Sequence, residues 1–253
     1  MRRTGPIEPG EGPVLAGATP ASREERLRLL RDGEILGGRP LALGSNGTFQ
    51  VRIAAPGALR LAVYKPRRGE SPLWDFPYND LFKREEAAYA LACLLGWDFV
   101  PETVIRDGPF GIGSGQRYIP GALAINEITE EQIPILQRFV AFDEIANNAD
   151  RKATHVLQDG AGRIWGIDHG LCFHEDYKMR SGIAAFAGRP LPAWLRAEID
   201  AIFAEPVGLE KLRQTLAPRL HDEEVEACIA RGQRLVIRGK FPQFNPRRVP
   251  WGW

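Results

Sequence analysis

Residues 147–170 read N-N-A-D-R-K-A-T-H-V-L-Q-D-G-A-G-R-I-W-G-I-D-H-G, and this stretch decides the expected fold. Its first half contains an Asp-Arg pair, Asp150 and Arg151, followed by a histidine, His155. Its second half is a short apolar run that ends in Asp168. The Asp-Gly pair between the halves is typical of a turn between paired strands. A hairpin here would bring His155 and Asp168 close together.

These side chains match the needs of phosphoryl transfer, which requires little covalent chemistry from a protein. It needs one carboxylate near the acceptor hydroxyl, and a carboxylate with a second ligand to hold a divalent metal on the phosphates. We assign the first role to Asp150, with Arg151 beside it, and the metal to Asp168 and His155. Each fragment alone is equally consistent with an ordinary surface turn, because short motifs often arise by chance. His155 is also consistent with a hydrogen-bonded core histidine.

A second pair of charged residues is expected further upstream. The strand at residues 59–64 ends at Lys65, and alternation places this lysine on the face of the leucines and valine. Residues 78–95 predict a helix on which Glu85 lies on the inward stripe and Glu86 on the wet face. An ammonium on an apolar face needs an anionic partner, which a nucleotide phosphate or Glu85 would supply. A solvated lysine at a strand end is the alternative.

Two backbone segments are candidates for nucleotide binding. The first is a turn between two alternating apolar runs, whose N–H groups would cover phosphates as glycine-rich loops do, or which is an ordinary β-turn. The second is the predicted strand 116–119, which follows the predicted strand 99–105 and precedes Pro120, where exposed backbone around Tyr118 could pair with an adenine edge. The candidate residues are Ser45, Asn46 and Gly47 in the turn, and Gln116, Tyr118 and Ile119 in the second segment.

Composition limits the classes of protein to which the chain can belong. The 253 residues are 44% hydrophobic and 26% charged, which is typical of a globular chain that buries a sizeable core. A net charge of +1 provides no global attraction to nucleic acid, so we expect no nucleic-acid partner. The three cysteines form neither a disulfide framework nor a zinc spacing, which favours a cytoplasmic location. No apolar run is long enough for a signal peptide or a membrane span.

The order of elements predicts an α+β protein. Residues 1–22 read as a flexible leader, and Ser22 with Glu25 as the capping box of a short helix. Residues 23–119 then form a β-rich N-lobe with one long helix. Pro120 breaks the pattern, and residues 120–253 form a helical C-lobe. Its predicted helices run from the capping box at Thr129 to 145, and over 192–203, 208–216 and 222–237.

In sequence order, the segments A-V-Y-K-P, R-E-E-A-A-Y-A-L, G-S-G-Q-R-Y-I-P-G-A, N-N-A-D-R-K-A-T-H and I-D-H-G-L-C-F resemble the phosphatidylinositol 3/4-kinase-like family. The resemblance is to its small bacterial members, which are related to HipA-type kinases and to type II phosphatidylinositol 4-kinases. It covers roughly residues 40–180. It implies a bilobal protein-kinase-like fold that uses ATP with Mn²⁺ or Mg²⁺. It also implies that Lys65 contacts the ATP phosphates and pairs with Glu85, that Asp150 serves the acceptor hydroxyl and that Asp168 holds the metal.

The chain departs from the family where His155 replaces the usual Asn, and a histidine nitrogen suits Mn²⁺ better than Mg²⁺. The acceptor stays open among a protein Ser/Thr, a small molecule and a lipid headgroup, because fold does not fix substrate. Membrane contact would rest on Trp74, Phe76 and Tyr78, which otherwise pack against the long helix. Two other functions fit the same fold: a catalytically silent nucleotide-binding module, and an enzyme that transfers AMP. We expect a monomer.

Overall fold

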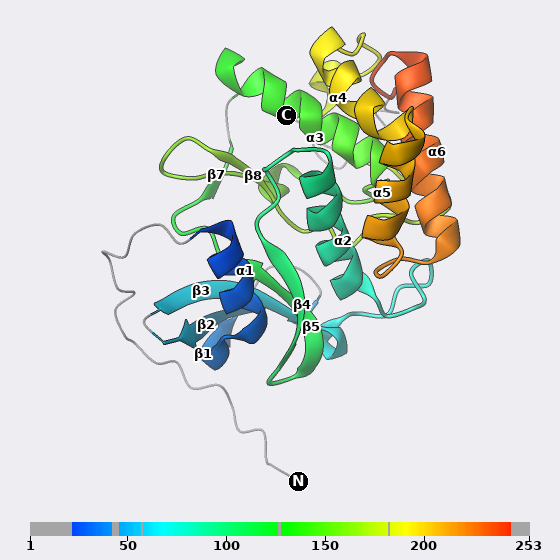
Figure 1. The fold of residues 1–253 in the computed structure, drawn as a ribbon. Coiled ribbons are helices and arrows are strands. Elements are labelled where there is room, and N and C mark those ends of the chain that lie inside the picture. Colours follow the sequence, from blue (N-terminus) through cyan, green and yellow to red (C-terminus); the bar gives the residue numbers. More distant parts are fainter. Residues whose placement is uncertain (1–21, 42–45, 57, 126–127, 182, 244–253) are drawn as a thin grey trace. The chain divides into compact units, whose positions relative to one another are not determined.

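The computed structural model describes residues 22–41, 46–56, 58–125, 128–181 and 183–243 (Figure 1). By their internal contacts, residues 1–86 with 101–119 form one compact unit, and residues 87–100 with 120–253 form a second. The predicted N-lobe ran without interruption to residue 119, whereas residues 87–100 belong to the second unit. The predicted leader lies almost entirely outside the described residues.

The first unit is built on a five-stranded antiparallel sheet of order β1-β2-β3-β5-β4 (Figure 1). The strands are β1 (Glu34–Pro40), β2 (Phe49–Ala55), β3 (Ala58–Pro66), β4 (Thr103–Gly108) and β5 (Gly111–Arg117). A 3₁₀ turn, η1 (Arg67–Gly69), follows β3. The predicted strands at 99–105 and 116–119 are therefore wrongly bounded. Phe99 and Val100 are buried in the second unit, so their apolar run is not the start of β4.

Helix α1 (Arg23–Asp32) covers one face of this sheet. The predicted capping box at its start is confirmed: Glu25 N–H donates to Ser22 Oγ at 3.1 Å, and Ser22 N–H donates to the Glu25 carboxylate at 2.6 Å. Leu30 of the helix packs with strand residues in one apolar cluster. The other buried members of the cluster are Val51, Ile53, Ala62, Tyr64 and Val104.

Helix α2 (Leu81–Leu94) begins in the first unit and ends in the second. It is shorter than the predicted 78–95 because Asn79 already has a left-handed backbone, with φ of 55°. Gly96, at φ of 70°, ends it in the conformation that a glycine adopts without strain.

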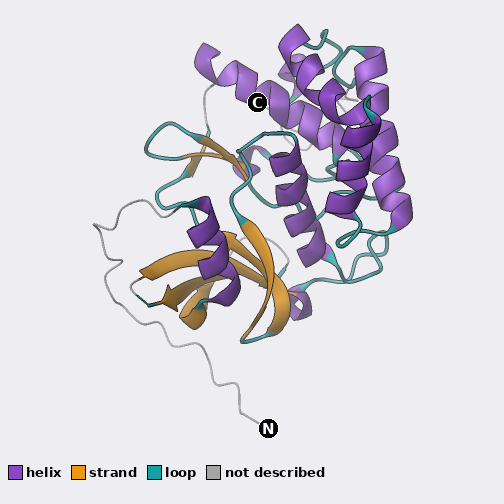
Figure 2. Cartoon of the chain, viewed as in Figure 1, coloured by secondary structure: helices purple, strands orange, loops and turns teal. Residues whose placement is uncertain are grey.

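The second unit is mainly helical, as the colouring in Figure 2 shows. Its helices are η2 (Glu130–Gln132), α3 (Ile133–Ile145), η3 (Ala153–His155), η4 (Ala184–Phe186), α4 (Ala193–Phe203), α5 (Pro206–Leu216) and α6 (Asp222–Arg238). The predicted capping box of Thr129 and Gln132 is confirmed and starts a 3₁₀ turn that leads into α3. The four predicted helices are therefore present, with ends displaced by a few residues.

A small antiparallel sheet of order β6-β7-β8 carries the predicted hairpin. It consists of β6 (Leu123–Ala124), β7 (Val156–Gln158) and β8 (Ile164–Gly166). Asp159 organises the turn: its carboxylate accepts the backbone N–H groups of Ala161 and Arg163 at 2.9 and 3.0 Å, and the indole N–H of Trp165 at 2.8 Å. The hairpin packs on an aromatic core in which Phe99 stacks on Phe139 at 4.1 Å between ring centroids.

Among the described residues, no helix combines the length and the hydropathy that a membrane span requires. The aromatic residues considered for membrane contact divide into two groups. Phe76 is buried, with the guanidinium of Arg84 5.0 Å from its ring centroid. Trp74 and Tyr78 are 89% and 59% exposed, so most of the surface of these two side chains is not covered by the long helix or by other described residues.

Candidate nucleotide and metal site

Lys65 and Glu85 form an ion pair in the first unit. The lysine is the penultimate residue of β3, and the glutamate lies on the second turn of α2. The glutamate side chain is 3% exposed and the lysine side chain 21%. The predicted partnership of these two residues is confirmed, and part of the lysine side chain stays accessible.

Alternation along β3 places Lys65 as expected, but the face it shares is not the main core. Ala62 and Tyr64, on the opposite face, are the buried members of the cluster under α1. Leu61 and Val63, on the lysine's face, are half-buried. The predicted alternation of side chains along the strand is thus confirmed, but the face predicted to be the more buried is the less buried of the two.

The helix phase around Glu85 also holds. Leu81, Ala88 and Ala92 are all buried, as the inward stripe requires. Glu86 is half-buried rather than on a wet face. Helix α2 is buried on most of its circumference, so its solvent side is narrower than amphipathic spacing predicts.

The candidate phosphate loop is only partly described, and Ser45 lies outside the described residues. Asn46 accepts the backbone N–H of Ser71 at 2.7 Å through its side-chain oxygen. Gly47 donates its N–H to the carbonyl of Gly69 at 2.7 Å. This amide is therefore engaged within the protein and is not directed at a phosphate in this conformation.

The three residues proposed to lie near adenine follow β5 or belong to its end. Gln116 is buried and donates from its side chain to Thr103 Oγ1 at 2.9 Å, so its side chain supports the sheet. The backbone N–H of Tyr118 donates to the carbonyl of Leu61 at 3.3 Å. Tyr118 and Ile119 are half-buried, and their part in nucleotide binding stays a prediction.

Asp150 lies in the second unit on the loop between α3 and β7. Its backbone N–H donates to the side-chain oxygen of Asn148 at 3.0 Å, which fixes the loop. Its carboxylate, 30% exposed, accepts a hydrogen bond from Lys152 Nζ at 2.7 Å. Lys152 was not singled out from the sequence, although it follows Asp150 by two residues. A flexible cation beside a partly exposed carboxylate is suited to binding an anionic group in transfer.

His155 and Asp168 come together as the hairpin predicted. His155 Nε2 lies 3.3 Å from Asp168 Oδ2, and the aspartate side chain is 48% exposed. Burial lowers the pKa of His155 to about 4, and the nearby Asp168 carboxylate opposes this shift only in part. The charges of Asp150, Arg151 and Lys152 also act on this imidazole, so the groups share one locality.

Arg151 is fully buried and does not face solvent. Its guanidinium donates to both carboxylate oxygens of Asp143 at 3.0–3.1 Å, and to the carbonyl of Ile167 at 3.1 Å. It also contacts the Nε2 atom of His169 at 2.8 Å. Burial opposes its charge, but the Asp143 carboxylate outweighs that effect and raises the pKa of the guanidinium. Arg151 thus ties α3 to the segment that carries Asp168.

Several residues of this network were missed by sequence reasoning. Asp143 is fully buried in an apolar helix and also accepts the side-chain N–H of Asn148 at 3.0 Å. Asn147 donates to the carbonyls of His174 and Asp176 at 2.8 and 2.6 Å, and so anchors the segment after Asp168. An acidic residue inside the apolar run F-V-A-F-D-E-I was the available signal, because a buried carboxylate requires a partner.

Left-handed backbone conformations cluster around the same locality. Asn147, Asp168 and Phe173 have φ of 54°, 60° and 68°. Such angles are uncommon outside glycine, and a phenylalanine adopts them only where the surroundings impose them. Strained residues of this kind concentrate at binding and catalytic sites.

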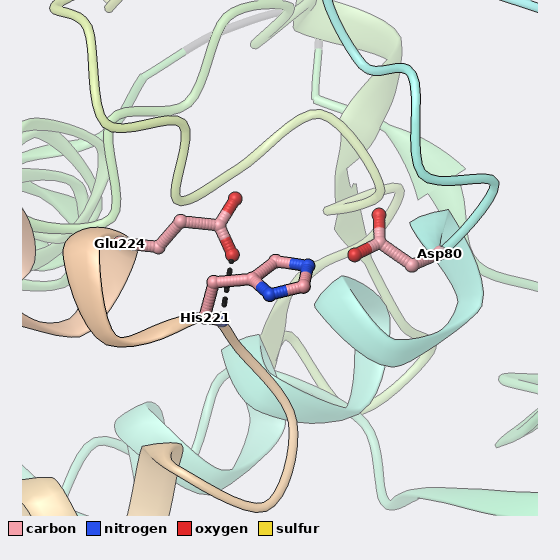
Figure 3. Close-up of side chains that lie close together, drawn as sticks. All are labelled: Asp80, His221 and Glu224. Carbon is pink, nitrogen blue, oxygen red and sulfur yellow. Dashed lines mark hydrogen bonds between the residues drawn. The ribbon is translucent and has the colours of Figure 1, made fainter.

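Three other residues, shown in Figure 3, have local structural roles. The backbone N–H of His221 donates to Glu224 at 3.0 Å, and this bond belongs to the capping box that starts α6. Asp80, in the first unit, accepts from the buried Arg84 at 3.0 Å.

Comparison with solved structures defines the class of fold. The chain resembles the Golgi casein kinase with Mn/ADP bound, with a TM-score of 0.59 and 15% identity over 85% of this chain and 74% of the other. It resembles hydra Fam20 with sugar at a TM-score of 0.60 and 13% identity, over 89% and 91% of the two chains. The protein therefore has a kinase-like α+β fold, as the sequence predicted.

The chain matches no protein-family model. It is 32% identical to Protein Rv2133c of Mycobacterium tuberculosis (strain ATCC 25618 / H37Rv), over 93% of this chain and 98% of that protein. It belongs to the same family as Protein Rv2133c.

Proposed function

We propose that the protein is an ATP- and divalent-metal-dependent kinase of the phosphatidylinositol 3/4-kinase-like type. The observation that carries this proposal is the Lys65–Glu85 ion pair on a unit with the kinase-like fold. In kinases an ion pair between a strand lysine and a helix glutamate positions the lysine on the nucleotide phosphates. The accessible part of Lys65 is what such a contact requires, and the buried Glu85 holds the ammonium in place.

The donor set of His155 and Asp168 fits a divalent metal. A pKa of about 4 keeps the imidazole neutral near pH 7, so a nitrogen lone pair is available, and the neighbouring carboxylate supplies an oxygen. A mixed nitrogen and oxygen set favours Mn²⁺ over Mg²⁺. When bound, the cation would neutralise charge on the β- and γ-phosphates. The presence of Mn and ADP in the Golgi casein kinase structure supports this choice.

Asp150 would orient the acceptor hydroxyl and accept its proton, and its carboxylate is exposed enough to be reached. Lys152 would stabilise negative charge on the transferring group. Arg151, assigned a catalytic part from the sequence, would act as a positioning residue, because its fully buried guanidinium contacts the Ile167 carbonyl and the His169 side chain, which flank Asp168.

The proposed acceptor is a hydroxyl group on a protein Ser/Thr, a small molecule or a lipid headgroup. The assignment to the phosphatidylinositol 3/4-kinase-like type rests on the motifs around Lys65, Asp150 and Asp168. Exposed Trp74 and Tyr78, near the exposed Arg67 and Arg68 in sequence, keep a lipid acceptor among the candidates.

Mass spectrometry of nucleotide and acceptor after incubation with ATP and Mn²⁺ tests the proposal. A kinase yields ADP and an acceptor that gains one phosphate. Transfer of AMP would instead release pyrophosphate, and a silent nucleotide-binding module would bind ATP without consuming it. Acceptors of each class should be supplied in parallel, with Asp150→Asn as the matched inactive control. Consumption of ATP that persists in this variant would contradict the assigned role.

A further inference from the structure

A cavity of about 660 Å³ lies within the second unit, and its lining includes none of the residues assigned above to metal and acceptor. It is lined by the last turns of α6, the chain that follows α6, and Tyr177. Its volume is in the range of small-molecule sites, which is roughly 300–1,000 Å³. The cavity is thus large enough for a small ligand.

Backbone hydrogen bonds fix the rim of this cavity. The chain after α6 pairs with the segment before α4 through Gly188 N–H to Pro242, Leu191 N–H to Gly239 and Phe241 N–H to Arg189, at 2.9–3.2 Å. Phe241 is buried and its ring lies 5.7 Å from that of Phe186. The walls are therefore built from ordered, packed chain.

The cavity carries an excess of positive charge. Arg234, Arg238 and Lys240 line it, and Glu144 is its one acidic lining residue in the described chain. Arg234 is half-buried, and its guanidinium carbon lies 5.9 Å from the ring centroid of Tyr177. Within the described residues, none of the three cations forms a salt bridge.

Glu144 is already engaged by other groups. It is buried, and its carboxylate accepts the phenol O–H of Tyr177 at 2.5 Å. Burial and the negative charge of Glu144 both raise the pKa of Tyr177, so the phenol stays protonated and donates its hydrogen bond. Arg231, also buried, lies near enough for its charge and that of Glu144 to act on each other. The one acidic residue among the described lining residues is therefore already engaged by Tyr177, and three cations line the same cavity.

The helix dipole does not account for all three cations. A cation in the last turn of a helix interacts favourably with the helix dipole, which explains Arg238 at most, because that dipole corresponds to about half a charge. Among the described lining residues, three cations thus face one acid, and an anionic ligand would complement them.

We propose that this cavity binds a small molecule that carries phosphate groups. Arginine guanidinium groups bind phosphate through paired hydrogen bonds, and a lysine adds a point charge. Tyr177, which is exposed, and the buried Leu235 and Phe241 also line the cavity and would supply apolar contacts for the organic part of the ligand. The site is independent of phosphoryl transfer at Asp150.

Calorimetric titration with inorganic pyrophosphate in the presence of a chelator tests the proposal. We expect wild type to bind, and Arg234→Gln with Arg238→Gln to weaken binding by about 100-fold, since two charge-assisted contacts are lost. Lys211→Gln, at an exposed lysine of α5 outside the cavity, should bind as wild type does. Lys240→Gln, an exposed single change that should not disturb folding, should weaken binding about tenfold.

The Lys65→Met variant separates this site from the nucleotide site. We expect it to retain pyrophosphate binding. If binding is lost in Lys65→Met and kept in the double arginine variant, the anion occupies the nucleotide site and the proposal is wrong. No binding to wild type at millimolar concentration would also overturn it. A sugar bisphosphate should bind in an Arg234-dependent manner, whereas exclusive binding of a phosphoserine peptide would refute a small-molecule ligand.

Discussion

Breaking the Lys65–Glu85 ion pair should reduce the stability of the protein even without nucleotide. Lys65→Met leaves the Glu85 carboxylate, 3% exposed, without this cation. Loss of one partner from a buried pair costs about 3–5 kcal/mol. The lysine side chain is 21% exposed, so solvent screens part of the interaction, and we expect a loss of about 2–3 kcal/mol. Urea unfolding of the apo protein, with an unchanged m-value, would measure it.

The same pair should show strong coupling in nucleotide binding. Lys65→Met and Glu85→Gln should each weaken ATP affinity, and the double variant should lose less than the sum by about 1–3 kcal/mol, because both changes remove one interaction. Lys83→Gln, at an exposed lysine on the same helix, serves as the control and should change neither quantity. Additive effects of the two changes on ATP affinity would refute the reasoning that Glu85 acts through Lys65.

Three further outcomes are expected. Asp150→Ala should keep ATP affinity while phosphoryl transfer, measured by product formation at saturating ATP, falls about 10²–10⁴-fold. Loss of ATP binding in this variant would show instead that Asp150 belongs to the nucleotide site. In the Arg234→Gln, Arg238→Gln variant, which lacks the proposed second anion site, ATP should raise the melting temperature only with a divalent metal, and Mn²⁺ more than Mg²⁺; equal stabilisation with a chelator present would exclude the assigned ligands. Arg151→Met should destabilise the fold by about 3–5 kcal/mol in urea unfolding, since it strands the buried Asp143 carboxylate, and a wild-type midpoint would contradict this.

Local features of the fold were predictable from the sequence because they depend on neighbours along the chain. The capping boxes at Ser22 and Thr129 need only a side chain and a backbone N–H three residues apart. The hairpin that joins His155 to Asp168 follows from a turn sequence between two apolar runs. The position of Glu85 on its helix follows from the 3.6-residue period, which is why its partnership with Lys65 was foreseen.

Only the tertiary structure decided which groups meet across the fold. Spacing assigned Arg151 to catalysis, yet packing buries it against Asp143 of α3 and makes it a structural link. Gly47 lies in a turn whose sequence suits a phosphate loop, but its N–H donates to the carbonyl of Gly69. The cations of the proposed anion site share a cavity with Glu144, which lies on α3, far from them in sequence. Periodicity fixes the direction of a side chain relative to its own helix or strand, whereas its partner depends on how distant elements pack, which no local pattern specifies.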